Sequence, residues 1–373
     1  MGSSTSPRDI DVLVVGAGPA GATAALNLAP IRQVALVDLR SQPRPRIGES
    51  LPPAARRLLS DMGLWDSFTA EGHSPCYGNR AVWSSPEPVE TDFLRDPDGH
   101  GWHIDRARFE LWLRDCAVDR GAMLVAPGRM QAIRRDGQRW CVELRTDAGP
   151  LDIRARLVID AGGRAAPVGR ALGACRHRHD KLFCGWLYGE ASAVGPGAGF
   201  TFVQAAEDGW WYTASVPGGR RVMAFHSDSD LPQARGLTDP GRLMERAAAH
   251  PELAAILVGS HFTPTNQFGV TAAQSARLRP FVGASWLAVG DAAFSCDPLS
   301  CQGLLNALYT GLMGAQAADR CLSGDDDALR EYGQALAQVH TVYRRRLAYW
   351  YGAETRWSNA PFWQRRHSAL DDA

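Results

Sequence analysis

A glycine-rich turn near the start of the chain constrains the fold more than any other feature. The run GAGPAG at 16–21 follows the apolar run Val12–Val15 and precedes an alanine-rich stretch. This order predicts a strand, a tight turn and a helix. Gly16 would allow the turn, Gly18 would let the backbone approach a phosphate, and Gly21 would let the helix pack closely on the strand. The helix N-terminus would then offer its unpaired N–H groups and positive dipole end to the phosphate.

An acidic residue follows the next apolar run. Val34–Val37 predicts a second strand, and Asp38 stands at its end, about twenty residues after the glycine turn. An acid at this place is typical of sites in which a carboxylate accepts hydrogen bonds from a ribose diol. A glycine turn alone is a weak signal. The complete succession of strand, glycines, helix, strand and acidic residue at this spacing predicts a dinucleotide-binding unit.

Composition and charge exclude several classes of protein. The 373 residues include 40 basic and 40 acidic ones, and the zero net charge argues against a nucleic-acid-binding protein held by phosphate contacts. No Cys-x-x-Cys pair and no signal peptide are visible, so we expect reduced thiols and a cytoplasmic location. Cys175–Cys184 lacks the spacing of zinc sites, so we expect a solvated loop there and no metal. No run is apolar for long enough to predict a transmembrane segment.

A second group of motifs lies far downstream. Ser285–Val289 predicts a strand that leads into Gly290 and Asp291, and the polar run DPLSCQG follows at 297–303. These motifs resemble those of FAD-dependent monooxygenases of the p-hydroxybenzoate hydroxylase type. The resemblance implies that the aspartate binds ribitol or ribose hydroxyls. It also implies that the loop brings backbone N–H groups and a helix N-terminus to the flavin, where the helix dipole would stabilise the anionic reduced form.

Three further segments carry the same resemblance. Arg106 opens a predicted helix, Leu157–Asp160 leads into a glycine loop, and Arg46–Ser50 holds a Gly-Glu-Ser turn like that of flavin-dependent halogenases and their relatives. No histidine or cysteine is clearly placed for a flavin linkage, so we expect noncovalent FAD. The expected cofactor-binding residues are Gly16, Gly18, Pro19, Ala20, Gly21, Asp38, Leu39, Arg40, Arg46, Glu49, Ser50, Arg106, Gly163, Gly290, Asp291, Pro298, Gly303 and Leu304.

The C-terminal part narrows the resemblance to a branch. Arginines and aromatic residues in Tyr343–Tyr351, Glu354–Trp357 and Phe362–Arg366 resemble the tail of the LodB, GoxB and QhpG group of halogenase-like flavoproteins. Members of that group oxygenate tryptophan side chains within a partner polypeptide during formation of quinone cofactors. Taken singly, these aromatic residues are better explained as the packing of a helix on the flavin domain.

The same resemblance provides a test for halogenation. Tryptophan halogenases need a catalytic lysine a few dozen residues after the Gly-Glu-Ser turn, whereas residues 51–100 contain none and Lys181 is the only lysine of the chain. Arginine stays charged and cannot replace an amine that must exchange a proton. The halogenase motif Trp-x-Trp-x-Ile-Pro is only approximated by Trp210–Pro217. Halogenation is therefore disfavoured but remains an alternative, as do a flavin-dependent prenyl reductase and a non-catalytic FAD-binding assembly protein.

The resemblance also implies a reaction. Reduced FAD would capture O2 as a C4a-hydroperoxide and transfer oxygen to an electron-rich aromatic ring, which we expect to be tryptophan-derived and to belong to a metabolite, peptide or protein. No second nucleotide domain is visible, so NAD(P)H would visit transiently or a separate flavin reductase would supply electrons. Candidates for stacking on the substrate are Trp210, Trp211 and Tyr212, and candidates for catalysis are His226 and Gln302.

The motif positions predict an α/β fold with a discontinuous FAD-binding domain of the GR2-type Rossmann class. Alternating apolar and aromatic residues in Gly209–Val216 and Arg221–His226 predict an antiparallel β-sheet that forms a substrate domain, and Pro240–Val258 predicts its outer helix. The expected FAD-binding segments are 8–80, 100–165 and 270–325. The expected substrate domain comprises 81–99 and 166–269, and 326–373 is the expected C-terminal helical tail.

Overall fold

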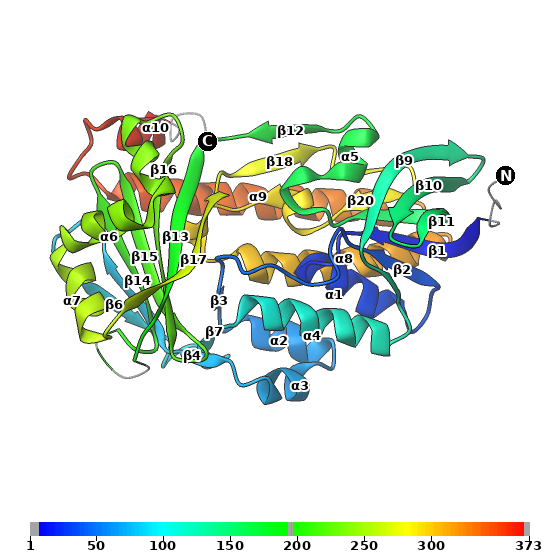
Figure 1. Ribbon diagram of the computed structural model, residues 1–373. Coiled ribbons are helices and arrows are strands. Elements are labelled where there is room, and N and C mark those ends of the chain that lie inside the picture. Colours follow the sequence, from blue (N-terminus) through cyan, green and yellow to red (C-terminus); the bar gives the residue numbers. More distant parts are fainter. Residues whose placement is uncertain (1–6, 193–194, 196, 369–373) are drawn as a thin grey trace.

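Two β-sheets of different construction form the framework of the molecule, and helices pack on both (Figure 1). The computed structural model describes residues 7–192, 195 and 197–368. The last five residues of the expected tail, 369–373, lie outside the described part. The mixed α/β fold confirms the predicted fold class.

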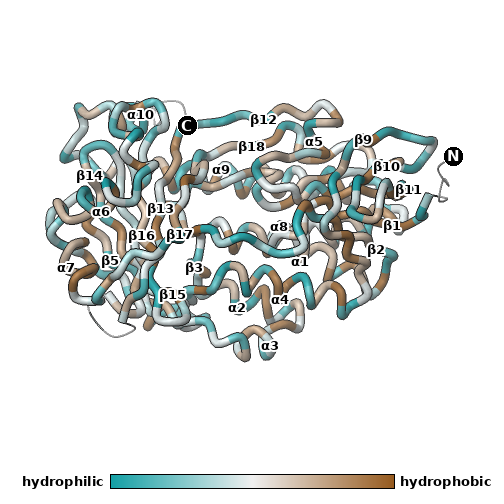
Figure 2. Tube along the Cα trace, viewed as in Figure 1, coloured by the Kyte–Doolittle hydropathy of each residue, from teal (hydrophilic) through white to brown (hydrophobic). Residues whose placement is uncertain are grey.

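The first sheet has eight strands and contains the glycine turn. Its central strands are parallel and buried, which explains their continuous apolar runs. In order, the strands are β19 (Val282–Gly283), β20 (Trp286–Ala288), β11 (Gly149–Asp160), β1 (Arg8–Val15), β2 (Val34–Val37) and β8 (Met123–Val125), and β10 (Arg139–Thr146) and β9 (Gly128–Asp136) continue from β11. Figure 2 shows hydrophobic segments (brown) gathered around β1 and β2.

Helices cover the first sheet, and the helix that follows the glycine turn packs against two others. Helix α1 (Pro19–Leu28) packs against α4 (Arg106–Asp119) and α8 (Gly303–Leu322). The neighbouring shorter helices are α2 (Ala55–Asp61), α3 (Trp65–Ala70) and α5 (Pro167–Ala171). Helix α1 begins at the glycine turn and α8 begins after the polar loop at 297–302. Because the two helices pack on each other, the two helix N-termini that the sequence predicts for cofactor binding belong to one packed layer.

The second sheet has seven strands and is antiparallel except for one pair. In order, the strands are β17 (Thr263–Ala272), β13 (Leu182–Glu190), β16 (Arg220–Asp228), β15 (Gly209–Val216), β14 (Phe200–Ala206), β5 (Gly78–Val82) and β6 (Val89–Asp92). Strands β5 and β17 therefore extend this sheet slightly past the segment boundaries expected at 80 and 270.

The outer face of the second sheet carries two helices where the sequence predicts one. Helix α6 (Pro240–Ala248) ends before α7 (Pro251–Gly259) begins. The cause is Pro251, which has no N–H to continue α6 and which holds the preceding His250 in an extended conformation. The expected single helix over Pro240–Val258 is corrected accordingly.

The molecule also contains two small, separate sheets of three strands each. One has the order β12 (Cys175–Arg178), β18 (Ala276–Arg279) and β21 (Phe294–Ser295), and the other β3 (Ser50–Leu51), β7 (Gly101–His103) and β4 (Ser74–Cys76). The loop expected at Cys175–Cys184 is thus partly wrong. Its first residues form a strand because β18, about a hundred residues further along the chain, supplies hydrogen-bond partners. Its last residues, from Leu182, belong to β13.

The C-terminal part consists of α9 (Ala328–Ala353) and α10 (Pro361–Ser368). Helix α9 runs along both sheets, and α10 lies against the second sheet near β16 (Figure 1). Within the described residues, no helix is both long and apolar enough to span a membrane.

The second sheet separates two hydrophobic cores. Its inner face, toward the first sheet, carries Trp210 and Tyr212, which belong to the main core. Its outer face carries Trp211 and Phe225, which pack beneath α6 and α7. Alternation along β15 requires this separation, because successive side chains point to opposite faces of a strand.

Candidate functional site

The three glycines of the first turn have different structural roles. Gly16 has φ +109°, and a Cβ there would lie 2.2 Å from the carbonyl oxygen of Ala161. A Cβ at Gly21 would lie 1.8 Å from the carbonyl oxygen of Gly16. Gly18 instead has φ −73°, which any residue adopts, and a Cβ there would meet only Arg46 Nη2, at 3.8 Å. The backbone at Gly18 therefore faces open space where a phosphate is expected to approach.

Both predicted helix N-termini are open to a ligand. Neither α1 nor α8 has a side-chain cap, so within the described residues the first N–H groups of each helix have no capping side chain as partner. A Cβ at Gly303, in the first turn of α8, would meet nothing within 4 Å. This arrangement fits a ligand with a pyrophosphate at one end and a hydrogen-bonding ring edge at the other, as FAD has.

Asp38 and a buried arginine hold the glycine turn in place. The Asp38 carboxylate accepts hydrogen bonds from the backbone N–H groups of Ala17, at 2.8 Å, and Arg40, at 3.0 Å. Arg114 lies 3.3 Å from the same carboxylate and donates to the Ala17 carbonyl at 2.7 Å. The predicted contact between Asp38 and a ribose stays a prediction. Sequence reasoning missed Arg114, because its position inside α4 carries no motif.

A buried carboxylate organises the two arginines predicted to contact the cofactor. Glu110 accepts hydrogen bonds from Arg106 Nε at 2.8 Å and from Arg46 Nε at 3.0 Å. Arg106 also donates to the Gly48 carbonyl at 2.9 Å. Burial opposes ionisation of Glu110, but the two guanidinium groups outweigh it and hold its pKa below the usual value. Sequence reasoning missed Glu110, although its spacing of four residues from Arg106 on a predicted helix was a usable signal.

We expect Glu110→Gln to raise the dissociation constant for FAD about tenfold, because hydrogen bonds between charged groups contribute roughly 1.5–3 kcal/mol and both arginines would lose their orientation. Titration of the apoprotein with FAD, followed by flavin fluorescence, measures the constant. Glu71→Gln is the control, since Glu71 pairs with the exposed Arg108 on the surface at 2.6 Å. Equal effects of the two substitutions would contradict the assigned role of Glu110.

The Gly-Glu-Ser turn contacts the inner face of the second sheet. The buried Glu49 carboxylate accepts hydrogen bonds from the hydroxyls of Tyr188 and, at 3.3 Å, Tyr212. The hydroxyls of Ser50 and Tyr212 lie 3.2 Å apart. Burial raises the pKa of Glu49, although the hydrogen bond from Tyr188 acts in the opposite direction. The turn therefore joins the cofactor segment to the sheet expected to bind substrate.

The residues predicted to bind substrate or to catalyse lie on both faces of the second sheet and in the loop before α8. Trp210 stacks on His226, with ring centroids 3.7 Å apart and planes at 5°. Both ring nitrogens of the buried His226 lack hydrogen-bond partners among the described residues, and burial lowers its pKa to about 3. Trp211 lies on the opposite face, so its grouping with Trp210 and Tyr212 is corrected. Gln302 is exposed, immediately before α8.

The Gly-Asp motif forms a tight turn that leaves its carboxylate accessible. Gly290 has φ +57° and donates its N–H to Thr310 Oγ1 at 2.7 Å. The Asp291 side chain is 38% exposed and lies 3.5 Å from Arg164 Nε. Gly163, in the predicted glycine loop, has φ +62° and open space at its Cβ position. An accessible carboxylate that directly follows a positive-φ glycine is suited to binding ligand hydroxyls.

Asp297, in the loop before α8, is hydrogen-bonded to two tyrosines of the C-terminal helix α9. Its buried carboxylate accepts hydrogen bonds from the N–H of Leu299 at 2.9 Å and the hydroxyl of Tyr351 at 2.8 Å, and its own N–H donates to Tyr343 Oη at 2.7 Å. Tyr351 also accepts a hydrogen bond from Trp210 Nε1 at 3.1 Å. Burial raises the pKa of Asp297 to about 7. No sequence pattern indicated this chain of contacts, because it joins three distant segments.

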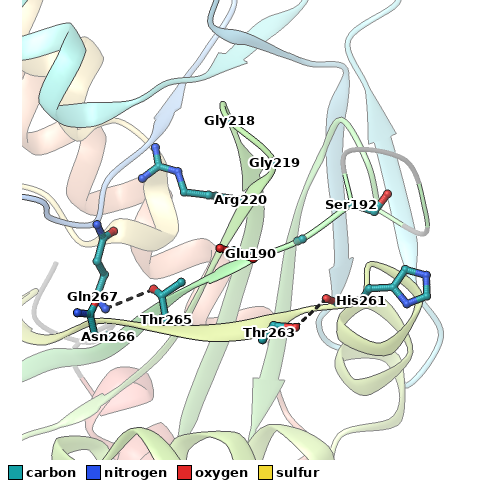
Figure 3. A pocket seen from close by; sticks show the side chains of 11 residues that line it. Glu190, Ser192, Gly218, Gly219, Arg220, His261, Thr263, Thr265, Asn266 and Gln267 are labelled. Atoms are coloured by element: carbon teal, nitrogen blue, oxygen red, sulfur yellow. Dashed lines mark hydrogen bonds between the residues drawn. The ribbon is translucent and has the colours of Figure 1, made fainter.

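Two cavities lie at the ends of the second sheet. A cavity of about 300 Å³ is lined by residues 179–181, which precede β13, by the last residue of β16, and by residues of α9 and α10 together with Asp297. A polar hollow of about 610 Å³ is lined by side chains of β13, β16 and β17, among them Arg220, Thr265 and Gln267 (Figure 3). None of the residues predicted from the sequence as substrate-binding or catalytic lines either cavity. Arg220 also donates a hydrogen bond, at 2.7 Å, to Asp105, the residue that caps the N-terminus of α4.

Known proteins match most of this chain. A family model described as an FAD binding domain matches residues 9–309. The putative FAD-dependent oxidoreductase LodB of Marinomonas mediterranea is 28% identical, over 97% of this chain and 99% of its own. The structure of the myxobacterial chondrochloren halogenase CndH is 24% identical with a TM-score of 0.86, and covers 98% of this chain and 89% of its own. The peptidyl tryptophan dihydroxylase QhpG is 25% identical with a TM-score of 0.75, covering 96% and 78%.

Proposed function

Because this chain belongs to the FAD binding domain family, we propose that it is an FAD-dependent monooxygenase that hydroxylates an electron-rich, tryptophan-derived aromatic ring. The observation that carries the choice of hydroxylation is the position of the only lysine. Lys181 lies exposed immediately before β13 and pairs with Asp230 at 2.7 Å. The Gly-Glu-Ser turn instead contacts two tyrosines. The turn therefore has tyrosine hydroxyls beside it and no amine that could hold a halogenating species.

The residues around the glycine turns would hold the cofactor. The N-terminus of α1 and Arg46 would bind the pyrophosphate, Asp291 would bind hydroxyls, and the loop before α8 would present N–H groups to the flavin edge. When bound, FAD supplies the redox chemistry and the activation of O2. We propose that NAD(P)H or a separate flavin reductase delivers the electrons.

The inner face of the second sheet would form the substrate wall. Trp210 and Tyr212 lie on this face, whereas Trp211 does not, so we retain only the first two as candidates for substrate contact. His226 remains a candidate for proton transfer because neither of its ring nitrogens is satisfied among the described residues. Gln302 remains a candidate because it is exposed at the start of α8.

The similarity to QhpG supports the proposal of a tryptophan-derived ring as substrate. QhpG is described as a peptidyl tryptophan dihydroxylase essential for tryptophylquinone cofactor biogenesis, and it matches nearly all of this chain. We therefore propose a tryptophan side chain within a partner polypeptide as the first substrate to examine, and free indoles as the second.

Mass spectrometry of reaction products tests this function. The purified FAD-loaded protein is incubated with NADPH or a flavin reductase, labelled O2, bromide and either a tryptophan peptide or free indoles. We expect an enzyme-dependent mass gain of one labelled oxygen atom. Bromine incorporation would instead establish the alternative halogenase activity. Reduced protein that consumes no O2 would exclude both oxygen-dependent activities and favour the prenyl-reductase or non-catalytic alternatives.

A further inference from the structure

The smaller cavity lies between the C-terminal helices and one end of the second sheet. Helix α9 contributes Arg344, Leu347, Ala348 and Tyr351, whose spacing places them on one side of the helix. Asp297 contributes from the loop that precedes α8. A volume of about 300 Å³ is at the lower end for small-molecule sites. The cavity therefore suits one flat ring system better than a large ligand.

Among the described residues, one cation in the cavity wall has no counter-ion. Lys181 pairs with Asp230 at 2.7 Å, and Arg366 pairs with Asp228 at 2.9 Å. Arg344 makes no hydrogen bond or ion pair within the described part of the chain. Its neighbour His179 adds no charge near neutral pH, because burial and, secondly, Arg344 itself lower the pKa of His179 to about 4. Arg344 is therefore free to bind an anionic group of a ligand.

The same cavity offers an acceptor and flat apolar surface. Asp180 and Asp297 both line the cavity, and the two oxygens of Asp180 accept hydrogen bonds from the N–H groups of Leu182 and Ser275, each at 3.0 Å. Asp297 is the candidate acceptor because its carboxylate is hydrogen-bonded to Tyr351, whose ring lies in the same cavity wall. Asp297 accepts one hydrogen bond at each oxygen, and each carboxylate oxygen can accept a second. Leu347 and Tyr351 supply surface for a ring.

We propose that this cavity binds an aromatic ring that carries an N–H donor and a carboxylate, with the carboxylate on Arg344 and the ring N–H directed to Asp297. The inference rests on the proposed function, since Asp297 begins the loop expected to hold the flavin. Two sources supply this chemistry. One is a free indole carboxylate, and the other is a tryptophan residue beside an acidic residue in a polypeptide.

Binding without turnover tests the site. Oxidised, FAD-loaded protein is titrated calorimetrically, without reductant, with indole-3-acetate, 3-methylindole and 1-methylindole-3-acetate. We expect indole-3-acetate to bind about tenfold more tightly than either analogue, since the first analogue lacks the carboxylate and the second lacks the N–H donor. The peptides Glu-Trp-Glu and Lys-Trp-Lys form a second arm, in which only the acidic peptide is expected to bind.

Two neighbouring arginines provide a matched pair of variants. Arg344→Gln is expected to weaken indole-3-acetate about tenfold and to leave 3-methylindole unchanged. Arg345→Gln is the control, because Arg345 is exposed on the same helix and does not line the cavity. It is expected to change neither affinity by more than about twofold. Circular dichroism and thermal unfolding verify that both variants fold.

The results distinguish a free indole carboxylate from a polypeptide as the ligand, and they test the binding site separately from the proposed function. Tighter binding of indole-3-acetate identifies a free metabolite, and tighter binding of Glu-Trp-Glu identifies a polypeptide. Binding of neither acidic ligand, or equal weakening by the two variants, overturns the site. Arg344-dependent binding without oxygen incorporation under turnover conditions would leave the site intact and refute the proposed function alone.

Discussion

Replacing Gly18 by valine is expected to give a folded protein that no longer binds FAD. The backbone at Gly18 has φ −73°, so a side chain causes no backbone strain, and a Cβ would have only Arg46 Nη2 within 4 Å. The branched side chain would instead fill the space that the phosphates must approach. We expect the dissociation constant for FAD to rise more than about a hundredfold.

Visible absorbance of the purified protein and titration of the apoprotein with FAD measure this loss. The unfolding midpoint of the apoprotein is expected to change by no more than about 3 °C. Gly236→Val is the control, because a Cβ there also meets nothing within 4 Å and Gly236 lies outside the candidate site. Gly21→Val should instead destabilise the fold, since its Cβ would lie 1.8 Å from a backbone oxygen. A yellow Gly18→Val protein would refute the assigned cofactor position.

Replacing Arg366 by methionine is expected to destabilise the protein by about 3 kcal/mol, because removal of one partner leaves a buried charge poorly compensated. Arg366 holds the buried Asp228 with two hydrogen bonds, at 2.9 and 3.1 Å, and its guanidinium stacks 3.4 Å from the ring centroid of Phe362. The substitution therefore releases α10 from β16 as well as exposing the charge of Asp228 to an apolar environment.

Equilibrium unfolding in urea measures this loss. Arg365→Met provides the control, since Arg365 also contacts Asp228, at 3.1 Å, but its side chain is 42% exposed. Replacing Arg365 should lower the free energy of unfolding by about 1 kcal/mol or less. Combining Arg366→Met with Asp228→Asn should recover part of the stability, because the uncompensated charge is removed. Similar losses for the two arginines would show that burial does not distinguish them.

The family and the α/β fold were predictable because their signals are local in the chain. Gly16 needs its positive φ within one turn, and Val34–Val37 forms a strand with the predicted bounds because four buried apolar residues suit a central parallel strand. The comparisons confirm the resemblance to FAD-dependent, halogenase-like flavoproteins. The expected role of each cofactor-binding residue, and the expected domain boundaries, remain predictions.

The contacts within the candidate site depend on residues far apart in the chain. Glu49 meets Tyr188 and Tyr212 only because the second sheet packs against the Gly-Glu-Ser turn. Asp297 meets Tyr351 only because α9 crosses both sheets. No local pattern carries such information, since each pair interacts through packing that the whole fold determines.

The glycine turns, the succession of strand, helix and strand along the first forty residues, and the lack of a lysine in residues 51–100 could be read from the chain alone, because each depends on residue type and near neighbours. Three features emerged only from the packed fold: Trp211 lies away from Trp210, Glu110 joins Arg46 to Arg106, and Arg344 has no ionic partner among the described residues of its cavity. The physical reason is that the face of a strand, the partner of a charge and the closure of a cavity are properties of packed elements.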